Sequence, residues 1–426
     1  MGAARAAIGL GYPDRMTSRV IALTITAALA LGMAGSASAG DIPAAVSGGS
    51  TPSTTGTWDT THTYGVNGTT RTCTLTRGAK CVGAKLRGKV KHHGDLRKAN
   101  LRRADLRFAD LRGANLSGAD LRSANLKYAD LRGANLKGAK FRYAAPVHRK
   151  KAKRGNGFSC DPNCQGANLT GANLTGAIVP RANLTGANLT NARLTRINLQ
   201  GANLTGANLT NASLPGANLQ GARLTRVNLQ GASLTSANLT RANLTDAIPG
   251  GVNLTGANLT KANLTRVNLQ GAKLAKANLD YVNLTSLNVA GASLQGATLN
   301  GASLTGADLT GANLQGAWFL ERARLTNADL KSANLQGASL GGADLTGANL
   351  QGASLLQANL PYAVLMGADL GSAVLIGANL QGANLIRANL TGAKLYGDAL
   401  EGVAPIVWID ATCPNGTKAS PIGCPA

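Results

Sequence analysis

The sequence predicts an all-β solenoid, and three observations lead to that fold class. A five-residue unit, Ala-Asn-Leu-Thr-Gly with variations, recurs through most of the 426 residues. In a straight helix, successive leucines five residues apart would be rotated by roughly 140° and would not form one stripe. In a straight strand, they would alternate between the two faces, because five is odd. Only 3% of the residues are aromatic, whereas Ala, Leu and Gly are abundant, which suits a narrow bore. The chain must therefore bend once in every unit.

Each residue of the unit has an expected place. We define Leu as position i, so that Ala is i−2, Asn or Asp is i−1, Thr or Arg is i+1 and Gly is often i+2. Between bends, i−2 and i point inward and i−1 and i+1 point to solvent. Gly at i+2 allows the turn dihedrals, and Pro180, Pro215 and Pro361 all fall at i+1, where a turn accepts proline. The predicted result is a β-solenoid with a small square bore.

The run Ala-Asn/Asp-Leu-x-Gly resembles the pentapeptide-repeat family, and the resemblance covers most of the chain. It implies a right-handed, four-sided parallel β-helix with four units per coil. Three runs of units, with centres at 86–141, 169–319 and 325–400, then give about 15 coils and a rod roughly 70 Å long. Lys91 and Pro249 fall on centres and should distort their sides, and one extra residue within 320–322 predicts a bulge.

The segments outside the repeats predict an exported protein. Residues 1–40 read as a bacterial-type signal peptide with a start at Met16, an apolar stretch at 20–33 and a cleavage site near Ala39. A membrane anchor is the alternative, but the apolar stretch is short and contains Gly and Thr. We expect a secreted chain with no transmembrane segment after signal removal. The other parts are a linker (41–57), an N-terminal cap with a hairpin on Asn67-Gly68 (58–82), a basic repeat block (83–145), an inserted basic loop (146–164), the main solenoid (165–402), and a C-terminal cap and tail (403–426).

Six cysteines fall as three local pairs that we place outside the regular repeats. In an exported chain they predict three disulfides, with zinc ligation or a redox pair as alternatives. No second cysteine pair or patterned histidine lies near the middle pair, so we expect neither a metal nor a cofactor. The predicted pairs are Cys73 with Cys81, Cys160 with Cys164, and Cys413 with Cys424.

The formal charge of +24 is concentrated in one part of the chain. Residues 83–154 hold 21 Lys or Arg and five Asp, and the aromatic residues outside the repeat centres are Phe108, Tyr128 and Tyr143. Units 20 residues apart should stack, so like charges repel by about 1 kcal/mol per pair in water, partly offset by Asp at i−1. This block predicts a polyanion-binding surface; solubility alone is the other interpretation. The candidate residues are Arg87, Arg97, Arg102, Arg107, Arg112, Arg122, Lys127, Arg132, Lys137, Arg142, Arg149, Lys150, Lys151, Lys153 and Arg154.

The sequence indicates no enzyme. It has only four histidines and no phosphate-binding loop, nucleophile elbow or metalloprotease motif, so we expect no catalytic residues and no small-molecule substrate. The leading hypothesis is an exported, non-enzymatic structural or protein-interaction scaffold. The alternative is a polyanion-binding module for nucleic acid or an anionic cell-surface polymer. The family resemblance adds a homodimer through the C-terminal cap at residues 403–409, and a topoisomerase-directed DNA mimic, which the basic charge and the export signal disfavour.

Overall fold

The structure is a computed structural model that describes residues 61–66, 69–88, 93–122, 124–140, 163–319, 323–395, 409–419 and 424. The chain divides into two compact units, Met1–Gly56 and Thr57–Ala426, and every described residue belongs to the second. The predicted signal peptide, linker, Lys91 and the bulge at 320–322 lie outside the described residues, as does nearly all of the predicted insert.

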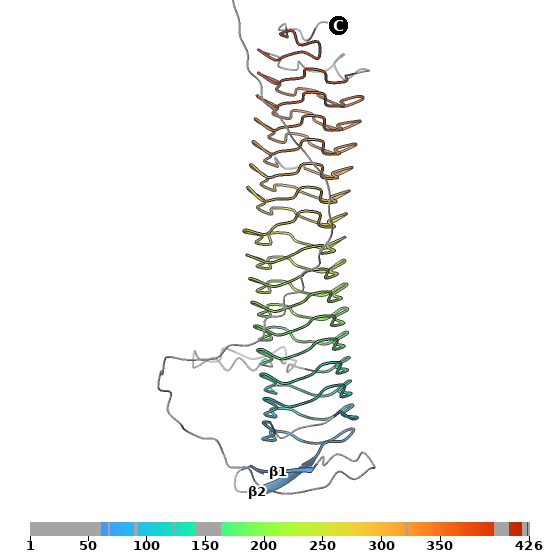
Figure 1. The fold of residues 1–426 in the computed structure, drawn as a ribbon, viewed down its shortest axis with the longest axis vertical. Helices are drawn as coiled ribbons and strands as arrows, with labels where there is room; N and C mark the ends of the chain where they lie inside the picture. The colour runs from blue at the N-terminus through green and yellow to red at the C-terminus, as the bar shows by residue number, and fades with distance from the viewer. Residues whose placement is uncertain are drawn as a thin grey trace, which may run out of the picture. The chain divides into compact units, whose positions relative to one another are not determined.

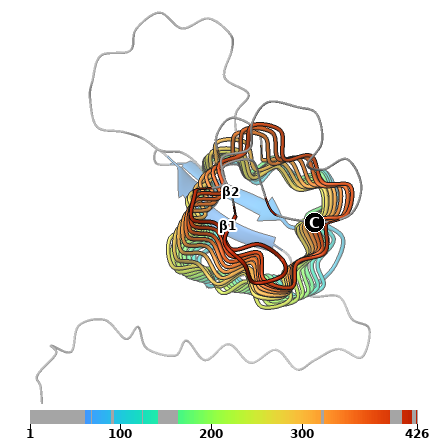
Figure 2. The ribbon, with the colours of Figure 1, turned by 90° about the horizontal axis from the view of Figure 1, so that it is seen from above.

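Within residues 57–426 the repeats form one column of stacked coils (Figure 1). Parallel bridges join residues that are 20 positions apart, such as Asn183 with Asn203 and Asn203 with Arg223. Seen from above, successive coils superpose around a narrow bore (Figure 2). Four five-residue units therefore complete each coil, which is the arrangement expected when the chain bends once per unit.

The backbone hydrogen bonds of one unit explain why Asn or Asp stands at i−1. In residues 202–206, the N–H groups of Asn203, Leu204 and Gly206 donate to carbonyls of the adjacent coils at 2.8, 2.7 and 2.9 Å. The N–H of Ala202 donates to the carbonyl that closes the preceding turn, at 2.9 Å. The fifth N–H, of Thr205, donates to Oδ1 of Asn203 at 3.1 Å. All five donors have partners, so the i−1 side chain completes the turn.

The core is a column of Leu and Ala. Positions i and i−2 are buried throughout the regular coils, and Phe319 replaces Leu at one centre without exposure. Each buried Leu contributes about 1.5–3 kcal/mol relative to an exposed one. Because the bore repeats every coil, stability accumulates with each added coil.

The ladder is interrupted where the sequence departs from the unit. Pro249 has no N–H to donate to the next coil, and Ile248 forms no bridge with Asn268 among the described residues. The predicted distortion at Pro249 is therefore present. A second interruption lies one coil further along, where no bridge joins Asn263 to Asn283 or Asn268 to Asn288 among the described residues.

Three changes of bridge spacing show where residues have been added. Asn125 bridges Asn163, 38 positions away instead of 20, so 18 residues enter the chain without breaking the stack. The spacing is 21 between Ser303 and Arg324, and 23 between Asn389 and Thr412. The repeat already resumes at Asn163, inside the range predicted for the insert. The basic and main blocks therefore form one column.

Both ends of the column carry a disulfide-linked cap. Strands β1 (Thr61–Val66) and β2 (Thr69–Thr74) pair antiparallel, with Val66 opposite Thr69, which confirms the predicted hairpin. The hairpin lies across the end of the bore (Figures 1 and 2), and the Cys73–Cys81 disulfide ties β2 to the first coil.

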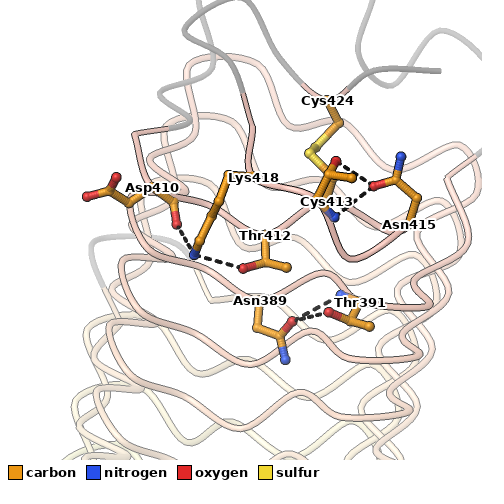
Figure 3. The surroundings of a disulfide bond; sticks show 9 residues. Asn389, Thr391, Asp410, Thr412, Cys413, Asn415, Lys418 and Cys424 are labelled. Atoms are coloured by element: carbon orange, nitrogen blue, oxygen red, sulfur yellow. Dashed lines mark hydrogen bonds between the residues drawn. A yellow bond between two sulfur atoms is a disulfide. The ribbon is translucent and has the colours of Figure 1, made fainter.

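The C-terminal cap is built from the last described residues (Figure 3). There the chain reverses, Thr412 bridges Lys418 antiparallel, and Cys413 is bonded to Cys424. Lys418 Nζ donates to the carbonyl of Asp410 at 3.0 Å and to Thr412 Oγ1 at 3.1 Å. A cap on the last coil protects apolar groups and strand edges that the end of a solenoid otherwise exposes.

The third predicted disulfide, Cys160–Cys164, is wrong for this structure. Cys164 is a free, buried cysteine at a repeat centre, because Asn163 before it bridges Asn183 and turns the thiol into the bore. Cys81 and Cys413 also occupy centres, so these cysteines do not lie outside the repeats as expected. Burial raises the pKa of the Cys164 thiol to about 12, which keeps it protonated. Cys160 lies outside the described residues.

Candidate functional site

The structure places the described part of the predicted anion-binding set on the outside of the first coils. Each residue stands at i+1, two positions after the residue whose side chain closes the turn. Arg142, Arg149, Lys150, Lys151, Lys153 and Arg154 lie outside the described residues. Those described are Arg87, Arg97, Arg102, Arg107, Arg112, Arg122, Lys127, Arg132 and Lys137.

Five of these arginines pair with an aspartate of their own unit. Arg112 is typical: its Nε lies 2.8 Å from Asp110 Oδ1, its Nη2 lies 2.8 Å from Asp110 Oδ2, and its backbone N–H donates to Oδ1 at 3.3 Å. A carboxylate at i−1 thus satisfies the turn and holds a guanidinium with two parallel bonds. The pairs are Asp95–Arg97, Asp105–Arg107, Asp110–Arg112, Asp120–Arg122 and Asp130–Arg132.

The arginines keep these carboxylates ionised. Hydrogen bonds from Arg97 lower the pKa of Asp95 to about 2, and the corresponding bonds lower the pKa of Asp105 and Asp110. For Asp120 and Asp130, burial opposes ionisation, but hydrogen bonds from the arginine of the same unit outweigh it and the pKa is again lowered. The five pairs remain charged over the whole physiological range.

The surface nevertheless stays positive. Residues 77–88 and 93–140 hold 15 Lys or Arg against five Asp. Arg87, Arg102, Lys127 and Lys137 follow Lys85, Asn100, Asn125 and Asn135, so their own units supply no carboxylate. Five of the nine described positions of the predicted ladder are ion-paired within their own units, and the block keeps a net positive charge.

Four side chains form what we name the aromatic–basic cluster: Arg87, Phe108, Lys127 and Tyr128. The Phe108 and Tyr128 rings stack with centroids 5.4 Å apart. The Arg87 guanidinium carbon lies 5.3 Å from the centroid of Phe108, and Lys127 Nζ lies 5.0 Å from that of Tyr128. Both rings are about half exposed, at 50% and 46%. Cations beside open aromatic faces suit a ligand that combines negative charge with flat groups.

Sequence reasoning named both aromatic residues but did not bring them together. The signal was present, because Phe108 and Tyr128 stand 20 positions apart at i+2 and therefore meet at one corner. Both have a positive φ of 59°, a conformation that glycine adopts at most equivalent positions. Placing aromatic residues there costs backbone strain, so the stack is a departure from the repeat rather than part of it.

The described residues hold no group of three or more His, Cys, Asp or Glu that could bind a metal. His93 Nε2 lies 3.1 Å from Asp110 Oδ1, but this contact belongs to the exposed Asp110–Arg112 ion pair and has no nucleophile beside it. Nor does the described part of the chain contain a helix long and apolar enough to cross a membrane. These features make the outer surface of the first coils the candidate binding site of this repeat-built solenoid.

The comparisons identify the repeat family. The family described as "Pentapeptide repeats (8 copies)" matches residues 99–138, 163–201, 192–231, 202–241, 216–248, 250–285, 288–319, 323–360 and 363–397. The chain belongs to the pentapeptide-repeat family, whose fold is a right-handed β-helix and whose members are generally non-catalytic structural or interaction proteins. No match was found among the curated proteins.

Three solved structures illustrate the similarity. HetL of Nostoc sp. strain PCC 7120, a pentapeptide-repeat protein involved in heterocyst differentiation regulation, is 34% identical over 60% of this chain and 93% of its own, with a TM-score of 0.37. A pentapeptide-repeat protein of the Arabidopsis thaliana thylakoid lumen is 28% identical over 31% and 71%, with a TM-score of 0.14. QnrB1, a plasmid-mediated fluoroquinolone resistance protein, is 16% identical over 53% and 91%, with a TM-score of 0.24.

Proposed function

We propose that this protein is an exported, non-enzymatic scaffold that binds another protein through its C-terminal coils. One observation supports this most directly. Along one side of nine successive coils the i+1 position is always Thr, from Thr185 to Thr346. The same ladder then continues as Met366, Ile386 and Ile409. Aliphatic side chains grouped on one solvent-facing ladder are typical of a protein-interaction site.

The apolar patch is accessible and self-complementary. Met366 is 40% exposed, Ile409 is 59% exposed and Tyr362, at the preceding corner, is 62% exposed. Beside the ladder, Arg387 Nε lies 4.0 Å from Asp410 Oδ2. A second copy of the chain, related by a twofold axis, would bury the aliphatic ladder and exchange these opposite charges. We therefore propose the second copy as the partner.

The test is the molar mass of the full chain in solution, measured by light scattering after gel filtration. We expect a dimer for the wild type and a monomer for Met366→Asp and Ile386→Asp. Thr346→Asp is the matched control, one coil away on the same ladder, and should remain dimeric. A wild-type chain that is monomeric at every concentration removes the second copy as the partner.

Export is the second part of the proposal. The signal-like sequence of residues 1–40 and the two disulfides support it, because structural disulfides persist in oxidising compartments. Fusing residues 1–40 to a phosphatase that is active only outside the cytoplasm should give activity. Removing residues 16–40 from the fusion should abolish it, and activity that survives this deletion argues against the predicted signal.

Polyanion binding is a second candidate function, supported by the aromatic–basic cluster. We expect the full chain to bind labelled single-stranded DNA with an affinity that falls as salt rises. Arg87→Ala and Lys127→Ala should each reduce the salt slope by about 0.7. Arg266→Ala is the matched control, since this arginine pairs with Asp246 in the main block. Equal losses in all three variants would indicate general charge attraction rather than a site.

A further inference from the structure

A junction between two coils of the main block is bridged on only two of its four sides. The bridged pairs, on two adjacent sides, are Asn253–Lys273 and Asn258–Asn278. The pairs on the other two sides have no bridge among the described residues, and we name these two sides the seam. The unbridged pairs are Ile248–Asn268 and Asn263–Asn283. The seam therefore separates the described residues up to 266 from those that begin at 268, and its two sides meet at one corner.

Backbone hydrogen bonds are missing at the seam as well. At the preceding junction on the side of Asn263, the N–H groups of Leu244, Asp246 and Asn263 donate to carbonyls across the junction at 2.8, 3.1 and 2.9 Å. At the seam, Pro249 has no N–H, and no backbone bond crosses either side among the described residues. The equivalent N–H groups that have no acceptor there are those of Gly251, Leu264, Arg266, Asn268 and Asn283.

Side chains beside the seam bond to coils that lie away from it. Arg266 Nε and Nη2 lie 2.6 and 2.7 Å from the carboxylate oxygens of Asp246, in the preceding coil. Thr285 Oγ1 lies 2.9 Å from Ser303 Oγ, in the following coil. The described inter-coil contacts of both edges therefore hold each edge to its own part of the column and not to the edge it faces.

Solvent exposure rises at the seam. On the ladder from Thr185 to Thr346, Thr265 and Thr285 are exposed, whereas the other threonines are half-buried. These two threonines lie on opposite edges of the seam. Leu287, an inward residue at i−2, is only partly buried, although every other inward residue within 163–319 is buried. A wider spacing between the two edges accounts for both observations.

We propose that the seam is a hinge. The column bends there by opening the corner at Arg266, while the two bridged sides act as the axis. Opening this corner breaks no backbone hydrogen bond, because none crosses it. Bending at the preceding junction on the side of Asn263 would break three of them, so the seam is the easier place to bend.

The hinge lies between the aromatic–basic cluster and the apolar patch. The side of the column that includes Asn263 carries Lys127 before the seam and Met366 after it. Bending at the seam therefore changes the directions in which these two surfaces face relative to each other. The hinge itself rests on neither of the functions proposed for them.

The test is the distribution of distances between two spin labels on the full chain, measured by double electron–electron resonance. Every variant also carries Cys160→Ser and Cys164→Ser, so that the remaining native cysteines are those of the two disulfides. Each pair of labels spans four coil junctions. The pairs are Thr225→Cys with Thr305→Cys across the seam, Thr185→Cys with Thr265→Cys before it on the same side, and Thr235→Cys with Gln315→Cys on the opposite, bridged side.

We expect the pair across the seam to give a distribution about twice as broad as that of either control pair, with the added width at longer distances. Equal widths for all three pairs would overturn the hinge. Equal broadening of the pair on the opposite side would overturn it too, since the coils would then shift as a whole rather than bend. Far-ultraviolet circular dichroism of each variant checks that the coils are retained.

Hydrogen exchange of the wild-type chain is a second test that needs no label. The backbone amides of residues 264–268 should exchange at least about tenfold faster than those of residues 244–248, which all have acceptors in the structure. Equal rates in the two segments would mean that the seam stays closed in solution and would contradict the proposal.

Discussion

The residue at i+2, at the corner of a coil, determines whether a side chain of the preceding coil can pack against the backbone there. Tyr128, Tyr281 and Tyr362 each lean on a glycine one coil further along, at Gly166, Gly301 and Gly382. Other corner glycines, such as Gly171, have nothing within 4 Å of the place where a Cβ would stand. The same residue type therefore serves the turn alone at some corners and both the turn and an aromatic contact at others.

Replacing two of these glycines separates the two roles. Gly166→Ala places a Cβ 2.6 Å from the Tyr128 ring at a φ of +62°, so it must displace the ring as well as strain the backbone. Gly171→Ala, at a φ of +64°, carries only the strain, about 1 kcal/mol. We expect a larger drop in the urea midpoint for Gly166→Ala, measured by circular dichroism. Equal midpoints for the two variants would show that the ring moves without cost.

Cys164 marks a second residue-scale departure. Cys164 and Val179 are smaller than the leucines that usually fill their positions, and an apolar void of about 20 Å³ lies at this level of the bore. Such a void is lined by side chains that have lost contacts on one side. Because all its walls are apolar, it offers water no hydrogen-bond partners.

Filling this void should stabilise the protein. We expect Cys164→Leu to raise the free energy of unfolding by about 1 kcal/mol, since the new side chain occupies the position that Leu holds in neighbouring coils. The measurement is the urea midpoint under non-reducing conditions, with Cys164→Ala as the opposite change. A lower midpoint for Cys164→Leu would mean that the void is too small and that the core is overpacked.

At the scale of the repeat unit, the basic block replaces Asn by Asp without altering the turn. Both side chains offer an oxygen to the N–H of residue i+1, as Asn203 and Asp110 do. Asp also holds the arginine at i+1. The block therefore tolerates a dense ladder of basic residues, because five of its nine described positions have a counter-charge in their own unit.

This pairing makes the stability of the basic block sensitive to acid. The pKa values of the five aspartates are lower in the folded chain than the ordinary value of about 4, so their contribution is complete above that pH. It is lost as the pH falls towards about 2, the pKa of Asp95. We expect the urea midpoint to fall over this range. The triple variant Asp105→Asn, Asp110→Asn, Asp130→Asn keeps the turn oxygen and should show a shallower fall; an unchanged slope would argue against the ion pairs.

The unit itself could be predicted from the sequence, because a spacing of five excludes straight helices and strands and assigns Ala and Leu to the interior. The hairpin followed from Asn67-Gly68 for the same local reason. The role of Asn203 in closing its turn could not be predicted. Any polar residue that points outward fits the pattern, whether or not its side chain accepts a hydrogen bond from the backbone. The buried position of Cys164 could not be predicted either. The length of the insert before it does not show at which residue the five-residue register resumes.

The candidate sites were less predictable than the fold. Charge composition located the basic block, but it could not show that the Asp110 carboxylate holds the Arg112 guanidinium with two parallel hydrogen bonds and also accepts the N–H of the turn. Tyr281 and Tyr362 stand at the same corner although they are 81 positions apart in the sequence, because the bridge spacing changes from 20 to 21 residues between Ser303 and Arg324. The repeat pattern alone does not show which corner the chain reaches after that change.

At the scale of the whole repeat column, cooperation between coils is limited to neighbours. Bridges join each coil to the one before and the one after, so the ends are the weakest points and the caps protect them. The two described disulfides close loops with sequence separations of 8 and 11 residues. Each is expected to stabilise its cap by about 2–3 kcal/mol by restricting the unfolded chain.

Removing one disulfide should therefore loosen one end only. In Cys413→Ser we expect faster amide hydrogen exchange in residues 409–419 and in the coil beneath, around Asn389. The coils around Asn203 should exchange as in the wild type. Cys73→Ser should show the opposite distribution. Faster exchange along the whole column in either variant would indicate that the coils unfold as one cooperative unit.

The neighbour-only bridges also determine how the chain responds to mechanical load. A pull on one terminus would detach coils one after another, because no bond spans more than two of them. Each detached coil frees 20 residues, about 70 Å of chain, while shortening the column by only about 5 Å. Stretched in this way, the column would lengthen in equal steps at nearly constant tension, and the disulfides at Cys73 and Cys413 would set the force at which the first step occurs.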